Sequence, residues 1–255
     1  MDQIFQIMTP TVLVVALMIG VFSGFIKGIT GFAMPTILIS GLSTVLPPDV
    51  ALAGLILPTL VTNGMQAFRQ GIRQAIGALR RYRVFLISGA VVLLIFAQLV
   101  TALSPAVMFT FIGCAVSMFA VMQLSGWQPN LPVRSARVEA AVGVFAGVTG
   151  GLSGIWGPPT VAYLTAMNTP KEEQVRAQGV IFGLGALLLF FAHVQSGVVR
   201  AQTLPFAALM IVPAVVGMWV GLQFQDRIAQ ATFKRLTLIV LFIGGLNLIR
   251  RGLLG

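Results

Sequence analysis

The sequence predicts an all-α, polytopic membrane protein, and three observations lead to this fold class. Hydrophobic residues make up 57% of the 255 residues and charged residues only 9%, whereas soluble domains contain about 45–50% and about 25%. The 50 residues between Arg83 and Arg134 contain no Asp, Glu, Lys or Arg. The apolar runs are continuous rather than alternating, which favours membrane-spanning helices over a β-barrel.

The composition also excludes other classes of protein. The net charge is +10, but nucleic-acid binding needs a clustered basic face on a soluble domain, so we expect no nucleic-acid partner. One His and one Cys are too few for a His/Cys metal cluster. The P-loop pattern of ATP-hydrolysing proteins does not occur in the sequence. We therefore expect neither an enzyme nor a bound metal or other cofactor.

An internal repeat with a constant offset of 123 residues divides the chain in two. The motif Gly20-Val21-Phe22-Ser23-Gly24 recurs as Gly143-Val144-Phe145-Ala146-Gly147. The same register relates Gly28 to Gly151, Thr30 to Ser153, Gly31 to Gly154 and Pro35 to Pro158. The repeat predicts two transmembrane modules at residues 1–124 and 138–255, joined by a polar linker at 125–137.

Each module contains five apolar segments. They cover residues 10–26, 34–46, 50–68, 84–103 and 106–124 in the first module, and 138–152, 157–167, 177–195, 203–223 and 234–250 in the second. The second segment of each module is short for a span of about 20 residues. The sequence therefore predicts about ten transmembrane segments, or eight spans if each short segment forms a broken hairpin with the segment before it.

The positions of Lys and Arg favour the ten-segment arrangement. With a periplasmic N-terminus, thirteen basic residues lie inside, many in an Arg-rich loop at residues 69–83, and three lie outside. Eight spans give at best ten against five and leave Lys27 in the membrane. Because five segments per module is an odd number, the second module would be inverted relative to the first. Inverted repeats are common in secondary transporters.

The two Gly-rich tracts give the strongest functional signal. Each tract predicts a helix, a glycine break and a new helix near Pro35 or Pro158. The free N–H groups at the start of such a helix attract anions. We therefore predict a small-anion site between the two breaks, near the midplane, formed by Gly28, Thr30, Gly31, Pro35, Gly151, Ser153, Gly154 and Pro158.

Close helix packing is the alternative role for these glycines. We assign Gly20, Gly24, Gly143 and Gly147 to packing, because their four-residue spacing is typical of it. Gly-Pro interruptions at corresponding places in two modules mark the binding sites of transporters. For that reason we favour a ligand-facing role for the rest of each tract, including Trp156.

The repeated tract, Gly-Val-Phe-x-Gly-x-x-x-Gly followed by Ile-Thr-Gly or Leu-Ser-Gly and a proline, resembles the sulfite exporter TauE/SafE family. The resemblance covers essentially the whole chain. It implies a transporter of the bacterial inner membrane that moves sulfite, organosulfonates or related anions, usually outward. The first tract departs from the pattern at Lys27, where glycine is common and where the second tract has Gly150.

Three polar side chains complete the candidate substrate site. Lys27 carries a charge at membrane depth, which marks a functional site, although its ammonium could instead snorkel to the lipid headgroups. Asn63 and Gln66 lie three residues apart and so share a helix face. Both amides could donate to an oxyanion, but an interhelical hydrogen bond is the commoner role of such side chains.

These observations predict a secondary transporter of small sulfur-containing anions that works by alternating access. An anion channel, or an accessory membrane subunit that carries no substrate, is the alternative. The expected partners are the small anion and the lipid bilayer, and the sequence is compatible with a homo-oligomer.

Overall fold

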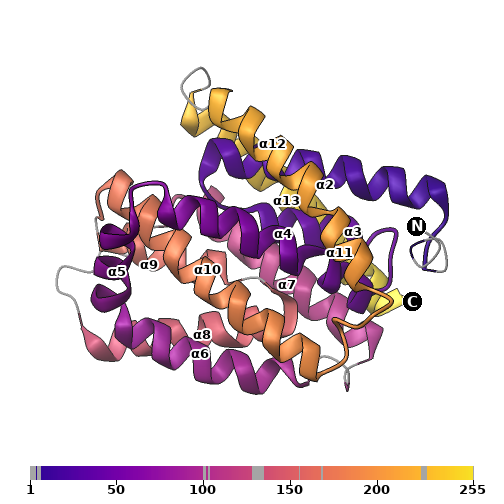
Figure 1. The fold of residues 1–255 in the computed structure, drawn as a ribbon, viewed down its shortest axis with the longest axis horizontal. Helices are drawn as coiled ribbons and strands as arrows, with labels where there is room; N and C mark the ends of the chain where they lie inside the picture. The colour runs from indigo at the N-terminus through magenta and orange to yellow at the C-terminus, as the bar shows by residue number, and fades with distance from the viewer. Residues whose placement is uncertain are drawn as a thin grey trace.

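The computed structural model describes residues 4, 7–99, 102, 104–127, 135–154, 156–167, 169–224 and 229–254. The described residues form helices and connecting turns and contain no strand, which confirms the all-α prediction (Figure 1). The helices are α2 (Pro10–Thr30), α3 (Met34–Leu42), α4 (Pro48–Phe68), α5 (Ile72–Arg81), α6 (Arg83–Ala97), α7 (Pro105–Leu124), α8 (Ala136–Ser153), α9 (Gly157–Ala166), α10 (Lys171–Gln195), α11 (Leu204–Leu209), α12 (Ile211–Phe224) and α13 (Gln230–Leu254).

Five helices among the described residues are long and apolar enough to cross a membrane. They are Pro10–Thr30, Pro48–Phe68, Ala106–Leu124, Glu173–Gln195 and Leu204–Phe224. The second segment of each module is short, as expected, because α3 has 9 residues and α9 has 10. Most of the expected linker at residues 125–137 lies outside the described residues.

The Arg-rich segment at residues 69–83 is not the loop that the sequence analysis expected. It contains helix α5, and α6 begins at Arg83. A pattern of apolar residues explains the helix: Ala75 and Ala78 are buried in a small cluster with Ala67 and Val180, while Ile72 and Ile76 face outward. This helix does not stand out as a charge-free stretch, because Arg73, Arg80 and Arg81 lie within it and Arg69 and Arg83 flank it.

The helices pack in four main pairs, α2 with α12, α4 with α10, α6 with α8 and α7 with α13. In Figure 1, α2 and α12 lie along one side of the molecule, α6 and α8 along the other, and α4 and α10 run between them. Each pair joins a helix of the first module to one of the second. The pairing is reciprocal, because the first segment of either module packs against the fourth segment of the other.

Glycines let the backbones approach most closely in two of these pairs, α2 with α12 and α6 with α8. A Cβ atom on Gly24 would lie 2.1 Å from the carbonyl oxygen of Ala214, and one on Gly28 would lie 2.4 Å from that of Met218. In the other pair, a Cβ on Gly147 would lie 2.5 Å from the carbonyl oxygen of Gly89. Gly151 likewise approaches α6. The packing role, which we weighed against ligand binding, is therefore the role that the structure gives to Gly28 and Gly151.

Polar contacts gather at two opposite ends of the helix bundle. At the Arg-rich end, Arg81 pairs with Glu173 at 3.1 Å, and the buried Glu139 accepts a hydrogen bond from the backbone N–H of Phe85. At the opposite end, Arg200 pairs with Asp49 at 3.4 Å, and Arg251 donates to the carbonyl oxygen of Ser43. These contacts join residues of both modules at each end.

Candidate functional site

Both predicted helix breaks are present. Helix α2 ends at Thr30 and is followed by Gly31 at φ 77°, after which Ala33 at φ 74° precedes α3. Helix α8 ends at Ser153 and is followed by Gly154 at φ 70°. Glycine ends helices in this way because the left-handed conformation costs it no steric strain. We call these the first break and the second break.

The two breaks lie at equivalent places against α10 and α4. A Cβ atom on Gly31 would lie 3.6 Å from Val175 and 3.7 Å from Oε1 of Gln178, both in α10. A Cβ atom on Gly154 would lie 3.4 Å from Leu52 and 2.9 Å from Leu55, both in α4. The offset of 123 residues relates Val175 to Leu52 and Gln178 to Leu55.

The two break glycines contact α4 at different positions along its axis. The first break lies beside Gln66 of α4, whose Nε2 atom is 3.8 Å from the Cβ position of Gly31. The second break lies beside Leu55 of the same helix. Eleven residues of α4 separate Gln66 from Leu55, a distance of about 16 Å along a helix. Gly31 and Gly154 therefore contact α4 at points about 16 Å apart along its axis, and a single anion site formed by both breaks stays a prediction.

Lys27 is buried inside the protein, with 1% of its surface exposed. Its ammonium donates a hydrogen bond to Oδ1 of Asn63, so the side chain links α2 to α4. The alternative in which Lys27 snorkels to the headgroups is wrong, because the side chain reaches into the helix bundle instead of toward its surface.

Asn63 and Gln66 both make the interhelical hydrogen bonds that the sequence analysis weighed. Asn63 binds Lys27, and Nε2 of Gln66 donates to the carbonyl oxygen of Val175 at 2.8 Å. Each amide has one further atom, Nδ2 of Asn63 and Oε1 of Gln66, that is buried with no hydrogen-bond partner in the described part of the chain. The two side chains therefore keep one free donor and one free acceptor.

Gln178 was missed by the sequence analysis. The side chain is 2% exposed, lies beside Gly31, and its Oε1 atom has no partner among the residues that the structure describes. It was overlooked because it stands at the start of an apolar stretch and its counterpart in the repeat is Leu55. We call Lys27, Asn63, Gln66 and Gln178 the polar cluster.

The polar cluster lies where α10 packs directly on α4. A Cβ atom on Gly183 would lie 3.8 Å from the Cβ atom of Asn63, and one on Gly179 would lie 2.7 Å from the backbone nitrogen of Ala67. These contacts come from the two helices that run through the middle of the bundle (Figure 1). The third segments of the two modules thus enclose the cluster together.

The other expected site residues lie outside the cluster. The Thr30 hydroxyl contacts the carbonyl oxygens of Ile26 and Phe32, each at 2.8 Å, and so caps the first break. Pro35 stands in the first turn of α3. The side chains of Ser153 and Pro158 lie outside what the structure describes. Gly28 and Gly151, as shown above, contact neighbouring helices.

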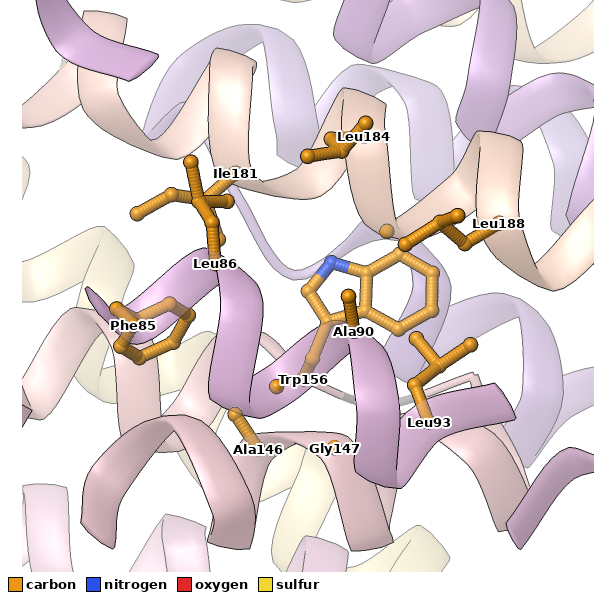
Figure 2. A pocket seen from close by; sticks show the side chains of 12 residues that line it. Phe85, Leu86, Ala90, Leu93, Ala146, Gly147, Trp156, Ile181, Leu184 and Leu188 are labelled. Carbon is orange, nitrogen blue, oxygen red and sulfur yellow. The ribbon is translucent and has the colours of Figure 1, made fainter. Parts of the chain in front are cut away.

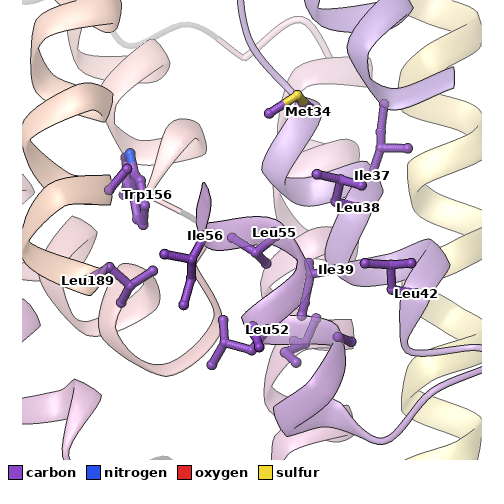
Figure 3. Close-up of a cluster of buried hydrophobic side chains, with 14 of the residues drawn as sticks. Met34, Ile37, Leu38, Ile39, Leu42, Leu52, Leu55, Ile56, Trp156 and Leu189 are labelled. Atoms are coloured by element: carbon purple, nitrogen blue, oxygen red, sulfur yellow. The ribbon is translucent and has the colours of Figure 1, made fainter. Parts of the chain in front are cut away.

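Trp156 packs in an apolar environment. The ring is 4% exposed and lies against Gly150 and Gly185, 2.9 Å and 3.2 Å from the positions that their Cβ atoms would take. Figure 2 shows it in an apolar pocket with Leu93, Ile181, Leu184 and Leu188. On the other side of the second break, Leu52, Leu55, Ile56 and Leu189 continue the apolar core (Figure 3).

Comparison with known proteins gives one match. A family model described as Sulfite exporter TauE/SafE matches residues 16–248, which include both breaks and the polar cluster. No curated protein and no solved structure matches the chain. In the part of the chain described, no group of three His, Cys, Asp or Glu side chains is placed to hold a metal ion.

Proposed function

The chain belongs to the sulfite exporter TauE/SafE family, and from this membership we propose that it is a secondary transporter that exports sulfite or an organosulfonate across the bacterial inner membrane. The family and the five apolar helices make it a multi-pass protein of a membrane-transporter family. The observation that carries the proposal is the ammonium of Lys27, held inside the bundle by an amide of Asn63.

The charge of Lys27 gives the reason to expect an anion. A buried charge is costly unless it is paired, and Asn63 is a neutral partner that satisfies one of the three N–H donors of the ammonium. An oxyanion supplies both the compensating charge and acceptors for the other donors. We therefore place the substrate at the polar cluster beside the first break, with Lys27, Asn63 and Gln66 in contact with it.

We further propose ten transmembrane segments in two inverted modules, with the N-terminus in the periplasm. The reciprocal pairing of α2 with α12 and of α6 with α8 supports a two-fold relation between the modules. The Arg-rich end is placed at the cytoplasmic side because basic residues favour it. Access to the cluster would alternate by movement of one module against the other.

The membrane potential favours the proposed direction. An anion that leaves a negative interior gains about 2.3 kcal/mol per charge per 100 mV. Export therefore needs no obligatory coupling ion. The substrate side chains proposed here include no acidic group, in agreement with a carrier that moves the anion alone.

The test is transport by the purified chain in liposomes loaded with labelled sulfite. We expect saturable efflux that is stimulated by unlabelled sulfite on the opposite side. Lys27→Met should reduce efflux at least about hundredfold, because the apolar side chain keeps the packing but removes the charge. Arg200→Met, which removes a cation of the exposed pair with Asp49, is the matched control and should transport normally.

Three results would contradict the proposal. Large single-channel currents would identify an anion channel, and no flux from the intact chain would identify an accessory subunit. Normal efflux by the Lys27→Met variant would remove the polar cluster from the transport path.

A further inference from the structure

We propose that the transported anion carries a hydrogen-bond donor of its own, as hydrogensulfite or a hydroxyalkanesulfonate does, and that Gln66 and Gln178 accept the hydrogen bond from that donor. The inference rests on the proposed function and deepens it, because it divides small anions into two chemical classes. Sulfite dianion and unsubstituted alkanesulfonates carry no such donor.

The orientation of two amides in the polar cluster is determined by their partners. Lys27 can only donate, so the Asn63 atom that it contacts must be the oxygen, and the free atom of Asn63 is the Nδ2 donor. The carbonyl of Val175 can only accept, so its partner is Nε2 of Gln66, and the free atom of Gln66 is the Oε1 acceptor. The two free atoms therefore differ in their hydrogen-bonding character.

One side of the cluster suits the oxygens of an anion. It presents the remaining N–H groups of the Lys27 ammonium and Nδ2 of Asn63, and both residues are buried. Charge-assisted hydrogen bonds from such groups are about twice as strong as neutral ones.

The other side of the cluster repels a bare oxyanion. The free Oε1 atoms of Gln66 and Gln178 both lie in buried side chains at the first break. The bond of Gln66 Nε2 to Val175 fixes Oε1 of Gln66 as an acceptor, so an anion oxygen placed against this atom would leave two acceptors with no hydrogen between them. An O–H or N–H group on the ligand removes this conflict, because it donates to a carbonyl oxygen. Sites built to bond a ligand hydroxyl discriminate strongly against analogues that lack it.

The donor and acceptor residues lie close together along α4. Asn63 and Gln66 are on adjacent turns of one face of α4, whose pitch is about 5.4 Å. A Cβ atom on Gly31 would lie 3.7 Å from Oε1 of Gln178, so the first break is in contact with this acceptor. The repeat offset relates Gln66 to Leu189 of the second module and Gln178 to Leu55 of the first, so the acceptor pair belongs to the first break.

The test compares two probes that differ in one group. The intact wild-type protein in detergent is titrated by calorimetry with 2-hydroxyethanesulfonate and with propane-1-sulfonate, in which a methyl group replaces the hydroxyl. We expect the hydroxylated probe to bind about tenfold tighter or more. Gln66→Met with Gln178→Met should abolish this preference, while the matched control, Leu55→Met with Leu189→Met, should retain it.

Each other outcome overturns the inference. Equal affinity of wild-type protein for the two probes would mean that the free carbonyl oxygens bind a structural water or another neighbour. A preference that persists in the double methionine variant, or in Gln178→Met alone should the double variant not fold, would place the recognition elsewhere. If labelled sulfite is transported in either case, the proposed function stands without this inference. If neither sulfonate binds and no sulfite is transported, both fail.

Discussion

The first break is polar and the second is apolar, although the repeat places them at equivalent positions. Gly31 lies beside Gln66 and Gln178, whereas Gly154 lies beside Leu52 and Leu55. Both glycines end their helices in the same left-handed conformation. The same backbone conformation therefore does not give the two breaks the same polarity. The side chains that line each break decide whether it can hold an anion.

An exchange of large and small residues accompanies this difference. In the second module the ring of Trp156 covers Gly150. In the first module, Ala33 is equivalent to Trp156 and Lys27 is equivalent to Gly150. The large side chain therefore lies after the break in the second module and before the break in the first. Trp156 fills the interior with apolar atoms at one break, and Lys27 brings a charge into the interior at the other.

The largest effect is expected when a lysine is added at the second break. In Gly150→Lys the new side chain meets Trp156, whose atoms lie 2.9 Å and 3.3 Å from the Cβ position. The counterpart of Asn63 there is the buried Ala186, which offers the ammonium no side-chain acceptor. A buried charge without a partner costs several kcal/mol. We expect little monodisperse protein after detergent extraction.

The control for this variant is Gly150→Met, which has a similar length and no charge. Both variants crowd Trp156, so the difference in their melting temperatures isolates the charge. If the lysine variant is as stable as the methionine variant, the second break tolerates a cation and the comparison of the two breaks is wrong.

The next largest effect is expected at Trp156. Trp156→Ala leaves a cavity between α6, α8 and α10 (Figure 2), and such truncations destabilise proteins by about 3–5 kcal/mol. Thermal unfolding in detergent measures this loss. Trp127→Ala is the control, because Trp127 is 62% exposed and should cost about 0.5 kcal/mol or less.

The same variant separates packing from substrate binding. If Trp156 only fills the core, the fraction of Trp156→Ala that folds should bind sulfite with the wild-type dissociation constant. A weaker affinity at unchanged stability would instead return Trp156 to the substrate site, where the sequence analysis placed it.

The sequence was sufficient to predict the breaks, but not what surrounds them. A glycine followed by a proline specifies the end of one helix and the start of the next through local backbone preferences, and both breaks were found at Gly31 and Gly154. The bond between Lys27 and Asn63 joins residues 36 positions apart, so no local pattern contains it. The packing of Gly28 against α12 depends on a helix almost 200 residues away and was unpredictable for the same reason.

The sequence carries more of this asymmetry than the exchange of Lys27 for Gly150 noted above. The repeat register aligns Lys27 with Gly150 and Ala33 with Trp156, which indicates that the two breaks are filled differently. The register also aligns Gln178 with Leu55. A comparison of the modules for changes in polarity, in addition to shared glycines, would have identified Gln178.

A smaller effect, on binding rather than folding, is expected when the charge of the first break is neutralised. In Asn63→Asp a carboxylate faces the ammonium of Lys27 in place of the amide oxygen. The protein should fold, because the buried cation gains a charged partner. Sulfite should bind about a hundredfold more weakly, a loss of about 2.8 kcal/mol, since the carboxylate competes for the ammonium and repels the anion.

The control is Asn247→Asp in α13. Asn247 accepts a hydrogen bond from Arg250 at an exposed position, so this variant makes the same change of charge beside a cation but away from the first break. Its dissociation constant for sulfite, measured by calorimetry, should equal that of the wild type. Similar weakening in both variants would show that net charge, and not the polar cluster, determines the affinity.

The smallest effects are expected when a methyl group is added to each break. Gly31→Ala and Gly154→Ala force alanine to positive φ, which costs about 1–2 kcal/mol. The methyl of Gly31→Ala meets its neighbours at 3.6–3.8 Å, whereas that of Gly154→Ala meets Leu55 at 2.9 Å, so the second variant should melt at the lower temperature. Only Gly31→Ala puts its methyl beside Gln66 and Gln178, and only this variant should weaken sulfite binding. Equal weakening in both would mean that the apolar break contributes to the site as much as the polar one does.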